Sequence, residues 1–233
     1  MPNPKTAQLP LHEEFLLLCL HDRKGTLVSS MSRIGIAAAL LAELLLREHV
    51  RVELPRRRKM IEAQGSRWED DPLLRECVEK IRTAKRRAVP QTWISRFSGI
   101  SKLHHRVATP LCARGILQVE ESKLLMVFKR KLYPERDPVP EREIVDRLRA
   151  AILSDGEVDS RTAILVSLAN ITGLLRPIFD GKMLKSRKQR IKALAKGEMV
   201  AAATKDAIAA AQAAIIATQA AVAAAMVTAS AGR

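Results

Sequence analysis

Aromatic residues make up only 3% of this 233-residue chain, so a hydrophobic core has to be built from aliphatic side chains. Cysteine is also scarce: Cys19, Cys77 and Cys112 are widely separated and form no CxxC pair. An odd, scattered set argues against a disulfide framework and predicts a reducing compartment. The first ten residues contain three prolines and no apolar stretch, which predicts no signal peptide.

The sequence also lacks the motifs that usually mark an active site. Isolated glycines such as Gly99 and Gly115 do not form a phosphate-binding loop, and no GxSxG segment is present. Residues 12–14, HEE, do not have the HExxH spacing of a zinc site. Cys19 lies in a leucine-rich run, which favours a buried thiol over a nucleophile. We therefore predict a protein that is not an enzyme, with no cofactor and no metal site.

Acidic residues are missing from two long segments. Between Lys80 and Val119 there are nine lysine or arginine residues and no acid, and between Lys182 and Lys196 there are seven more. The formal net charge is +15, so these sixteen charges account for all of it and the remainder sums to −1. Segregated positive charge predicts a polyanionic partner, either an anionic membrane surface or a nucleic acid. A generally basic, solvated surface is the simpler alternative.

Long aliphatic runs predict the centre of the fold. The segments near 12–20, 33–47 and 161–175 are strongly apolar, a pattern typical of buried helices. Glu43 lies inside the second segment, where a buried carboxylate needs a structural partner such as an arginine. Further helices are expected around this centre, at 72–81, 93–98, 105–114, 141–153 and 182–196.

Helix boundaries and one hairpin can also be predicted. Asp71, before Pro72, is expected to cap one helix, and Asp159 or Ser160 to cap the third central helix. Val50–Leu54 alternates as a short strand does. The charged residues 120–123 are flanked by two apolar segments, Ile116–Val119 and Leu124–Phe128. This pattern predicts a β-hairpin in which the two segments are the strands and residues 120–123 are the loop.

The expected fold class is therefore mainly α, a single globular helical domain with buried central helices, surrounding amphipathic helices and one β-hairpin. This domain spans 11–199, after a disordered leader at 1–10 and before an Ala-rich helix or tail at 200–233. Residues 207–229 carry no charge and are long enough to cross a bilayer. Gln212 and Gln219 would need partners in hydrocarbon, which favours a surface helix instead.

Two groups of basic residues are candidate anion contacts. On the predicted helix 182–196, four lysines spaced by three or four residues form a positive stripe: Lys185, Lys188, Lys192 and Lys196. Such a stripe is usually a solvated face; apposed to an anionic membrane, each charge contributes about 1 kcal/mol. The second group lies just before a helical stretch, an arrangement that suits a phosphate: Lys102, His104, His105 and Arg106.

Six segments occur in an order that resembles a known family. The first, at 11–25, reads LHEEFLLLCLHDRKG, an apolar helix that breaks into a charged turn. The others are 41–44 with Arg47, 71–76, Trp93-Ile94 with Ser98-Gly99, 114–117 and 159–175. Together they resemble the Golgi phosphoprotein 3 family over most of residues 11–196. The leader and the Ala-rich tail are not covered.

This resemblance implies a non-catalytic helical domain that is peripheral to membranes. Members of the family bind phosphatidylinositol 4-phosphate on the cytosolic Golgi face and gather glycosyltransferase tails and coat proteins there. The family's hairpin supports self-association, which implies a homo-oligomer through Ile116–Phe128 in this chain.

The family's lipid-site residues are mostly replaced here. By ungapped alignment, its tryptophan falls at Val28, an arginine at Ala37, and two further basic positions near Ser101 and His104. Only His104 keeps basic character. Arg33 lies four residues before Ala37, which places both on one face of a helix. The resemblance and the nearby basic residues together predict a remodelled lipid head-group site: Arg33, Lys102, His104 and Arg106.

The sequence thus predicts a cytoplasmic adaptor on the cytosolic face of a membrane, the Golgi in a eukaryotic cell. It would dock on anionic, phosphoinositide-like head groups and recruit the tails of membrane proteins. A nucleic-acid-binding module explains the charge equally well and is the alternative, although no helix-turn-helix or aromatic stacking surface is recognisable. A bacterial member of the family with another membrane partner also fits.

Overall fold

The computed structural model describes residues 8–21, 23–53, 60–65, 69–124 and 128–198 of the chain. Its centre consists of three buried helices, α1 (Leu11–Cys19), α2 (Ser32–Leu46) and α7 (Ser160–Ile171). These are the central helices that the aliphatic runs predict. Helices α1 and α2 pack closely where Gly35 faces Phe15, because a Cβ on this glycine would lie 2.3 Å from the phenyl ring.

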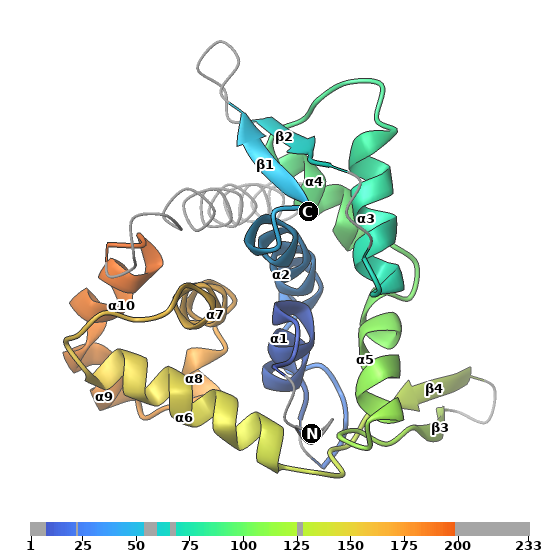
Figure 1. Cartoon of the computed structure of the whole chain (residues 1–233). Helices are drawn as coiled ribbons and strands as arrows, with labels where there is room; N and C mark the ends of the chain where they lie inside the picture. Colours follow the sequence, from blue (N-terminus) through green and yellow to red (C-terminus); the bar gives the residue numbers. More distant parts are fainter. Residues whose placement is uncertain (1–7, 22, 54–59, 66–68, 125–127, 199–233) are drawn as a thin grey trace, which may run out of the picture.

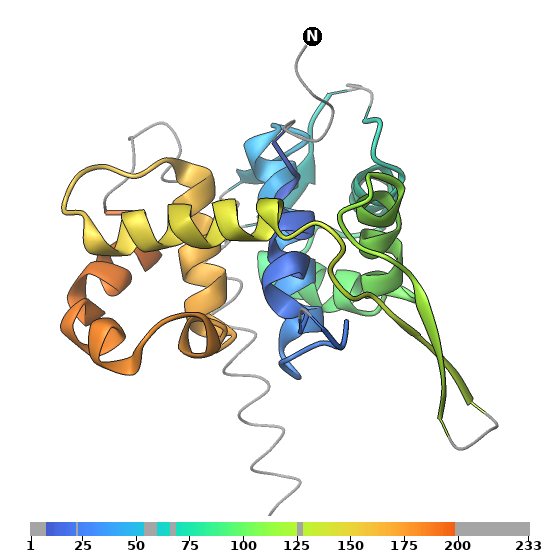
Figure 2. The same cartoon turned by 90° about the horizontal axis from the view of Figure 1, so that it is seen from below.

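Two groups of helices flank this centre (Figure 1). One group comprises α3 (Pro72–Arg82), α4 (Pro90–Ser98) and α5 (Leu103–Ala113). The other comprises α6 (Val139–Leu153), α8 (Leu175–Ile178), α9 (Gly181–Ser186) and α10 (Lys188–Ala195). Turning the molecule by 90° keeps α1 and α2 between the two groups (Figure 2). The prediction of a mainly α domain is confirmed.

Two aspartates begin helices as predicted. The Asp71 carboxylate accepts hydrogen bonds from the backbone N–H groups of residues 73 and 74, at 2.7 and 3.2 Å, and Pro72 is the first residue of α3. Asp159 accepts from Thr162 N–H at 2.9 Å at the start of α7. Helix α7 ends at Ile171, four residues earlier than predicted, because Gly173 adopts a left-handed φ of 77°.

A short antiparallel pair, β1 (Val50–Glu53) and β2 (Met60–Ala63), follows α2. The strand predicted at 50–54 is thus present. Its partner was not anticipated, since four residues give too little alternation to distinguish a strand from a loop. Residues 54–59, between the two strands, lie outside the described residues.

The second antiparallel pair is the predicted hairpin, but its predicted limits were wrong. The strands are β3 (Glu120–Leu124) and β4 (Phe128–Leu132), so the charged residues 120–123 are strand and not loop. Ile116 and Leu117, taken as the first strand, are instead buried against the body, with 1% and 2% of their surface exposed. Because these apolar residues are buried in the body, each strand of the hairpin begins four residues later than predicted. The hairpin projects from the body beside α5 (Figure 2).

The single helix predicted at 182–196 is also wrong, because the chain breaks between α9 and α10 at Arg187. The Arg187 guanidinium donates to the carbonyl oxygens of Ile152 and Leu153, both at 2.8 Å, at the end of α6. Arg190, which is buried, donates to the Ala151 carbonyl at 3.1 Å. These hydrogen bonds to α6 hold the two short helices against the body. The hydrophobic periodicity of the sequence gives no sign of such distant contacts, so it could not predict the break.

The two ends of the chain are described only in part. Leu9 is buried in the core, and its carbonyl oxygen accepts from Arg161 at 3.1 Å. Residues 1–7 of the predicted leader and the Ala-rich segment 200–233 lie outside the described residues. Within the described part, no helix combines the length and apolar character needed to cross a bilayer.

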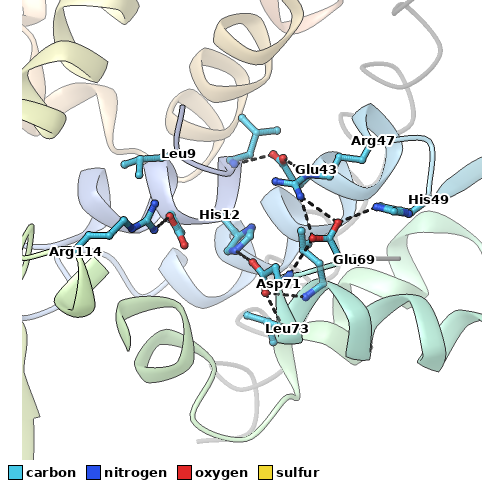
Figure 3. Close-up of polar contacts among 12 residues, drawn as sticks. Leu9, His12, Glu43, Arg47, His49, Glu69, Asp71, Leu73 and Arg114 are labelled. Carbon is cyan, nitrogen blue, oxygen red and sulfur yellow. Dashed lines mark hydrogen bonds and ion pairs between the residues drawn. The ribbon is translucent and has the colours of Figure 1, made fainter. Parts of the chain in front are cut away.

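A network of buried charges ties the central helices together (Figure 3). Glu43 is fully buried in α2 and accepts from the N–H of Leu11, the first residue of α1, at 2.8 Å. Its carboxylate also pairs with Arg47 at 2.7 Å and with Arg161 of α7 at 3.0 Å. Burial alone would raise the pKa of Glu43, but the Arg161 guanidinium and the other donors hold it below its ordinary value. The arginine partner predicted for this carboxylate is confirmed.

The network continues from α2 to the start of α3. Arg47 bridges Glu43 to Glu69, at 3.0 Å from the second carboxylate, and His49 contacts Glu69 at 2.8 Å (Figure 3). His12 of α1 contacts Asp71, the cap of α3, at 3.1 Å. These contacts fix how α1, α2 and α3 lie relative to one another, so they orient the surface loops that each helix carries.

Candidate anion-binding site

A hollow of about 460 Å³ opens where α5 begins, between β4 and the loop at 25–27. We call it the α5–β4 hollow. Its polar lining is basic or neutral and contains no acid: Lys102, His104, His105, Lys131 and Tyr133. Its volume lies within the range of small-ligand sites, and its charge suits an anion.

Lys102 has an unusual backbone conformation at the edge of this hollow. It precedes α5 with φ 52° and ψ 34°, in the left-handed region. A side chain there costs about 1 kcal/mol or more, which a glycine would avoid. Strained residues gather at functional sites, and Lys102 brings a positive charge to the edge of this hollow.

A second cation and two hydrogen-bonding groups complete the polar lining: His105 from α5, Lys131 from β4 and Tyr133 just after β4. His105 Nδ1 lies 2.8 Å from the Tyr133 hydroxyl, and Lys131 of β4 lies on the same hollow. Burial lowers the pKa of His105, and the charges of Lys131 and Lys102 lower it further. The imidazole is therefore neutral near pH 7 and gains a charge only in more acidic solution.

Gly25 closes the third wall by a close backbone contact. Its φ is 57°, and a Cβ there would lie 2.2 Å from Pro134 N and from the Tyr133 carbonyl carbon. Tyr133 N–H donates to the Gly25 carbonyl at 3.0 Å. Only glycine allows the turn after α1 to lie against this segment, so Gly25 positions the loop that lines the hollow.

The structure brings together two of the four residues predicted for the head-group site. Lys102 and His104 line the α5–β4 hollow, whereas Arg33 and Arg106 do not. The Arg33 guanidinium donates to the carbonyl oxygens of Ser98 and, at 2.9 Å, Ile100. It thereby fixes the turn that leads into Lys102.

Arg106 is directed toward α3. Its Nη1 atom lies 2.6 Å from Glu76 Oε2. Burial acts to raise the pKa of Glu76, but the Arg106 and Lys80 charges hold it below its ordinary value. This ion pair links α5 to α3.

The three other family positions, Val28, Ala37 and Ser101, do not line this hollow. Ala37 is fully buried, so a ligand at the surface cannot contact it. Val28 is 45% exposed but lines a neighbouring hollow that contains the acids Glu135 and Glu141. The basic lining therefore differs in composition from the arrangement that the alignment implies.

Three of the four lysines of the predicted stripe line a second hollow, of about 920 Å³, next to α8, α9 and α10. They are Lys185 from α9 and Lys188 and Lys192 from α10. We call this feature the α8–α10 hollow. Lys196 is not part of its lining and lies 3.3 Å from Glu198.

Sequence reasoning missed Lys131 and Tyr133 as members of the α5–β4 hollow, whereas His105 belongs to the basic cluster that it identified. Lys131 was overlooked because the predicted hairpin ended at Phe128, which left this lysine outside it. Tyr133 was recognisable only once the loop at 25–27 and the end of β4 were known to meet. In the sequence, only the short distance between Lys131 and Tyr133 along the chain could have suggested that the two residues belong to one site.

A group of potential metal ligands lies within the buried network. His12, Glu13 and Asp71 each place one donor atom within 4.8 Å of the others. All three are engaged by the protein, since His12 pairs with Asp71 and Glu13 pairs with Arg114. Burial raises the pKa of Glu13, although Arg114 opposes this effect. The group acts as a set of helix-to-helix contacts.

The fold is that of a mainly helical protein whose described surface carries two basic hollows without acidic lining residues. The family model for Golgi phosphoprotein 3 (GPP34) matches residues 11–211, and the chain belongs to this family. Comparison with curated proteins gave no match.

Proposed function

We propose that this protein is a non-catalytic, peripheral membrane protein that binds anionic phosphoinositide head groups, such as that of phosphatidylinositol 4-phosphate. The α5–β4 hollow is the head-group site in this proposal. The observation that carries it is the convergence of Lys102, Lys131 and His104 on an acid-free hollow in a member of this family.

The chemistry of the hollow supports a phosphorylated ligand. Lys131 of β4 and Lys102 before α5 supply positive charge, and the Tyr133 hydroxyl adds a neutral hydrogen-bonding group. A phosphomonoester carries up to two negative charges and three oxygen acceptors, so it can contact several of these groups at once. The two lysines flank the site as point charges, which tolerate several positions of the phosphate on the inositol ring.

The other parts of the proposal concern partners and place. Membership of the family favours an adaptor that binds membrane-protein tails on the cytosolic face of a membrane, the Golgi in a eukaryotic cell. The hairpin β3–β4 projects from the body and is the proposed surface for self-association (Figure 2). Its exposed position leaves it accessible to a second copy of the chain.

Liposome flotation tests this proposal. The full chain is expected to float with vesicles that contain phosphatidylinositol 4-phosphate and to remain at the bottom with pure phosphatidylcholine. The double variant Lys102→Gln/Lys131→Gln is expected to lose roughly tenfold or more in affinity, since each charge near an anionic surface contributes about 1 kcal/mol.

The matched control is Lys85→Gln/Arg86→Gln, which removes two exposed charges on the loop after α3. This variant is expected to float like the parent chain. Equal losses in both double variants would show that only overall charge matters and would contradict a head-group site. Tight binding to duplex DNA, with no flotation, would instead support the nucleic-acid alternative.

A further inference from the structure

The α8–α10 hollow lies at the other side of the molecule from the α5–β4 hollow. Helices α1 and α2 separate the two regions (Figure 1), and the hairpin and the segment 175–195 extend toward the same side of the body (Figure 2). The two hollows are therefore separate sites.

Four cations line the α8–α10 hollow, and no acid does: Arg176, Lys185, Lys188 and Lys192. All four are exposed and have no ion pair within the described residues. Neighbouring arginines behave differently. Arg187 pairs with Asp155 at 2.6 Å, and Arg190 donates to the Gly156 carbonyl at 2.6 Å. Arg187 and Arg190 thus hold α9 and α10 in place, whereas the four lining cations have no such partner in the described part of the chain.

Apart from Asn170, the rest of the lining consists of glycine and apolar residues. The apolar wall of the hollow is formed by side chains of α7, α8, α9 and α10: Ile171, Leu175, Leu184 and Ile191. The hollow therefore combines apolar surface with lysines. Inorganic phosphate could pair with the lysines but would leave the apolar surface without a partner. A ligand with both an anionic group and a hydrocarbon chain would satisfy both parts.

We propose that the α8–α10 hollow binds one molecule of an anionic amphiphile, with its phosphate at Lys185, Lys188 and Lys192 and its acyl chain on the apolar wall. This inference depends on the proposed function in one respect: the protein has to be at a membrane, which is the source of the ligand. It adds a second lipid site, which would hold the protein to the bilayer at two points and increase its avidity.

Charge complementarity favours this ligand over the chain's own C-terminal segment. Residues 199–233 are Ala-rich and apolar, but they contain one acid, Asp206, against Lys205 and Arg233. They would leave the four cations of the hollow without counter-charge. A single lipid phosphate supplies that charge together with the chain.

The test is a calorimetric titration of the full chain with three soluble probes. These are dioctanoyl phosphatidic acid below its micelle concentration, dioctanoyl phosphatidylcholine and glycerol 3-phosphate. The background is Lys102→Gln/Lys131→Gln, so that the α5–β4 hollow does not contribute. Phosphatidic acid is expected to bind at one site, at least tenfold more tightly than either other probe.

Substitution then locates the site. Adding Lys185→Gln/Lys188→Gln/Lys192→Gln is expected to weaken phosphatidic acid binding at least tenfold. The matched triple change, Lys85→Gln/Arg86→Gln/Lys182→Gln, is expected to change it less than twofold. All six positions are exposed, so folding should be retained, and circular dichroism checks this. Leu184→Ser, on the apolar wall, is expected to weaken phosphatidic acid binding and leave glycerol 3-phosphate binding unchanged.

Three results would overturn the inference: equal binding of the two lipids, equal binding of phosphatidic acid and glycerol 3-phosphate, or no difference between the two triple variants. A hollow that is covered by the C-terminal segment would give no binding at all, which also contradicts it. The proposed function has a separate readout, because flotation of the chain with intact Lys102 and Lys131 tests that site. Either proposal can therefore fail while the other stands.

Discussion

Charges are paired with opposite charges in the buried network but gather with charges of the same sign in the basic hollows. Around Glu43, every carboxylate that joins α1, α2, α3 and α7 has a positive or hydrogen-bonding partner, and most of the atoms involved are hidden from water. In the α5–β4 and α8–α10 hollows, cations gather without an acid in the lining. The comparison shows that charges inside this protein define the arrangement of helices, whereas charges at the hollows remain available for a ligand.

The largest expected effect comes from breaking the buried network. Glu43→Gln removes the charge that faces Arg47 and Arg161, and leaves Arg161 half-buried without its main partner. We expect a loss of about 3 kcal/mol in the free energy of unfolding, measured by urea denaturation. The exposed pair Arg82–Glu79 provides the control: Glu79→Gln is expected to cost less than about 1 kcal/mol. Similar losses in the two variants would show that burial is not what gives the network its effect.

A backbone change at the hollow should affect stability and binding together. In Gly25→Ala, the new Cβ would meet Pro134 N and the Tyr133 backbone at 2.2 Å, so the loop at 25–27 has to move. We expect a loss of about 2 kcal/mol in stability and weaker flotation with phosphoinositide vesicles. Gly156→Ala is the control, because a Cβ there meets nothing within 4 Å. Unchanged binding by a destabilised Gly25→Ala chain would show that this loop does not shape the site.

Lys102 allows stability and binding to be separated. Lys102→Gly relieves the left-handed strain at φ 52°, so stability should rise by up to about 1 kcal/mol, while loss of the charge should weaken vesicle binding about fivefold. Glu48 has φ 58° and lies away from both hollows, so Glu48→Gly is expected to gain stability with no loss of binding. If both variants bind vesicles like the parent chain, the lysine charge has no role in binding.

The smallest expected effect is a dependence of binding on pH. The pKa of His105 is lowered by burial and by Lys131 and Lys102, so the imidazole is neutral at pH 7 and becomes charged as pH falls. A bound anion favours the charged form. The head-group phosphate loses charge over the same range, so between pH 7.5 and pH 5.5 the affinity of the parent chain should fall less, or rise more, than that of His105→Asn. The same titration of His105→Asn checks the assignment, and an equally steep pH dependence in that variant would contradict it.

The central helices and their caps could be predicted because the signals are local. Aliphatic runs define α1, α2 and α7, and the carboxylates of Asp71 and Asp159 act within three residues of their own positions. A lone glutamate in an apolar helix also implied an arginine partner, and Glu43 has two. Local chemistry was sufficient in each of these cases.

The hairpin limits and the α9–α10 break could not be predicted, because distant contacts decide them. Ile116 is drawn into the core, and Arg187 bonds to the end of α6, more than thirty residues away in the chain. The same reason explains the site. Lys102 and His104 were recognisable from charge clustering, but the turn at Gly25 and the end of β4 at Lys131 meet them only in the folded molecule.

A titration of the full chain with inositol 1,4-bisphosphate, followed by amide NMR shifts, tests the central claim most directly, because this molecule is the soluble head group alone. We expect saturable shifts at residues 102–106, at Lys131 and Tyr133 and in the turn at Gly25, with none around the buried Glu43. Lys102→Gln/Lys131→Gln should abolish them. Shifts that are absent from the α5–β4 hollow, or that persist in the double variant, would contradict the claim that this hollow binds the head group.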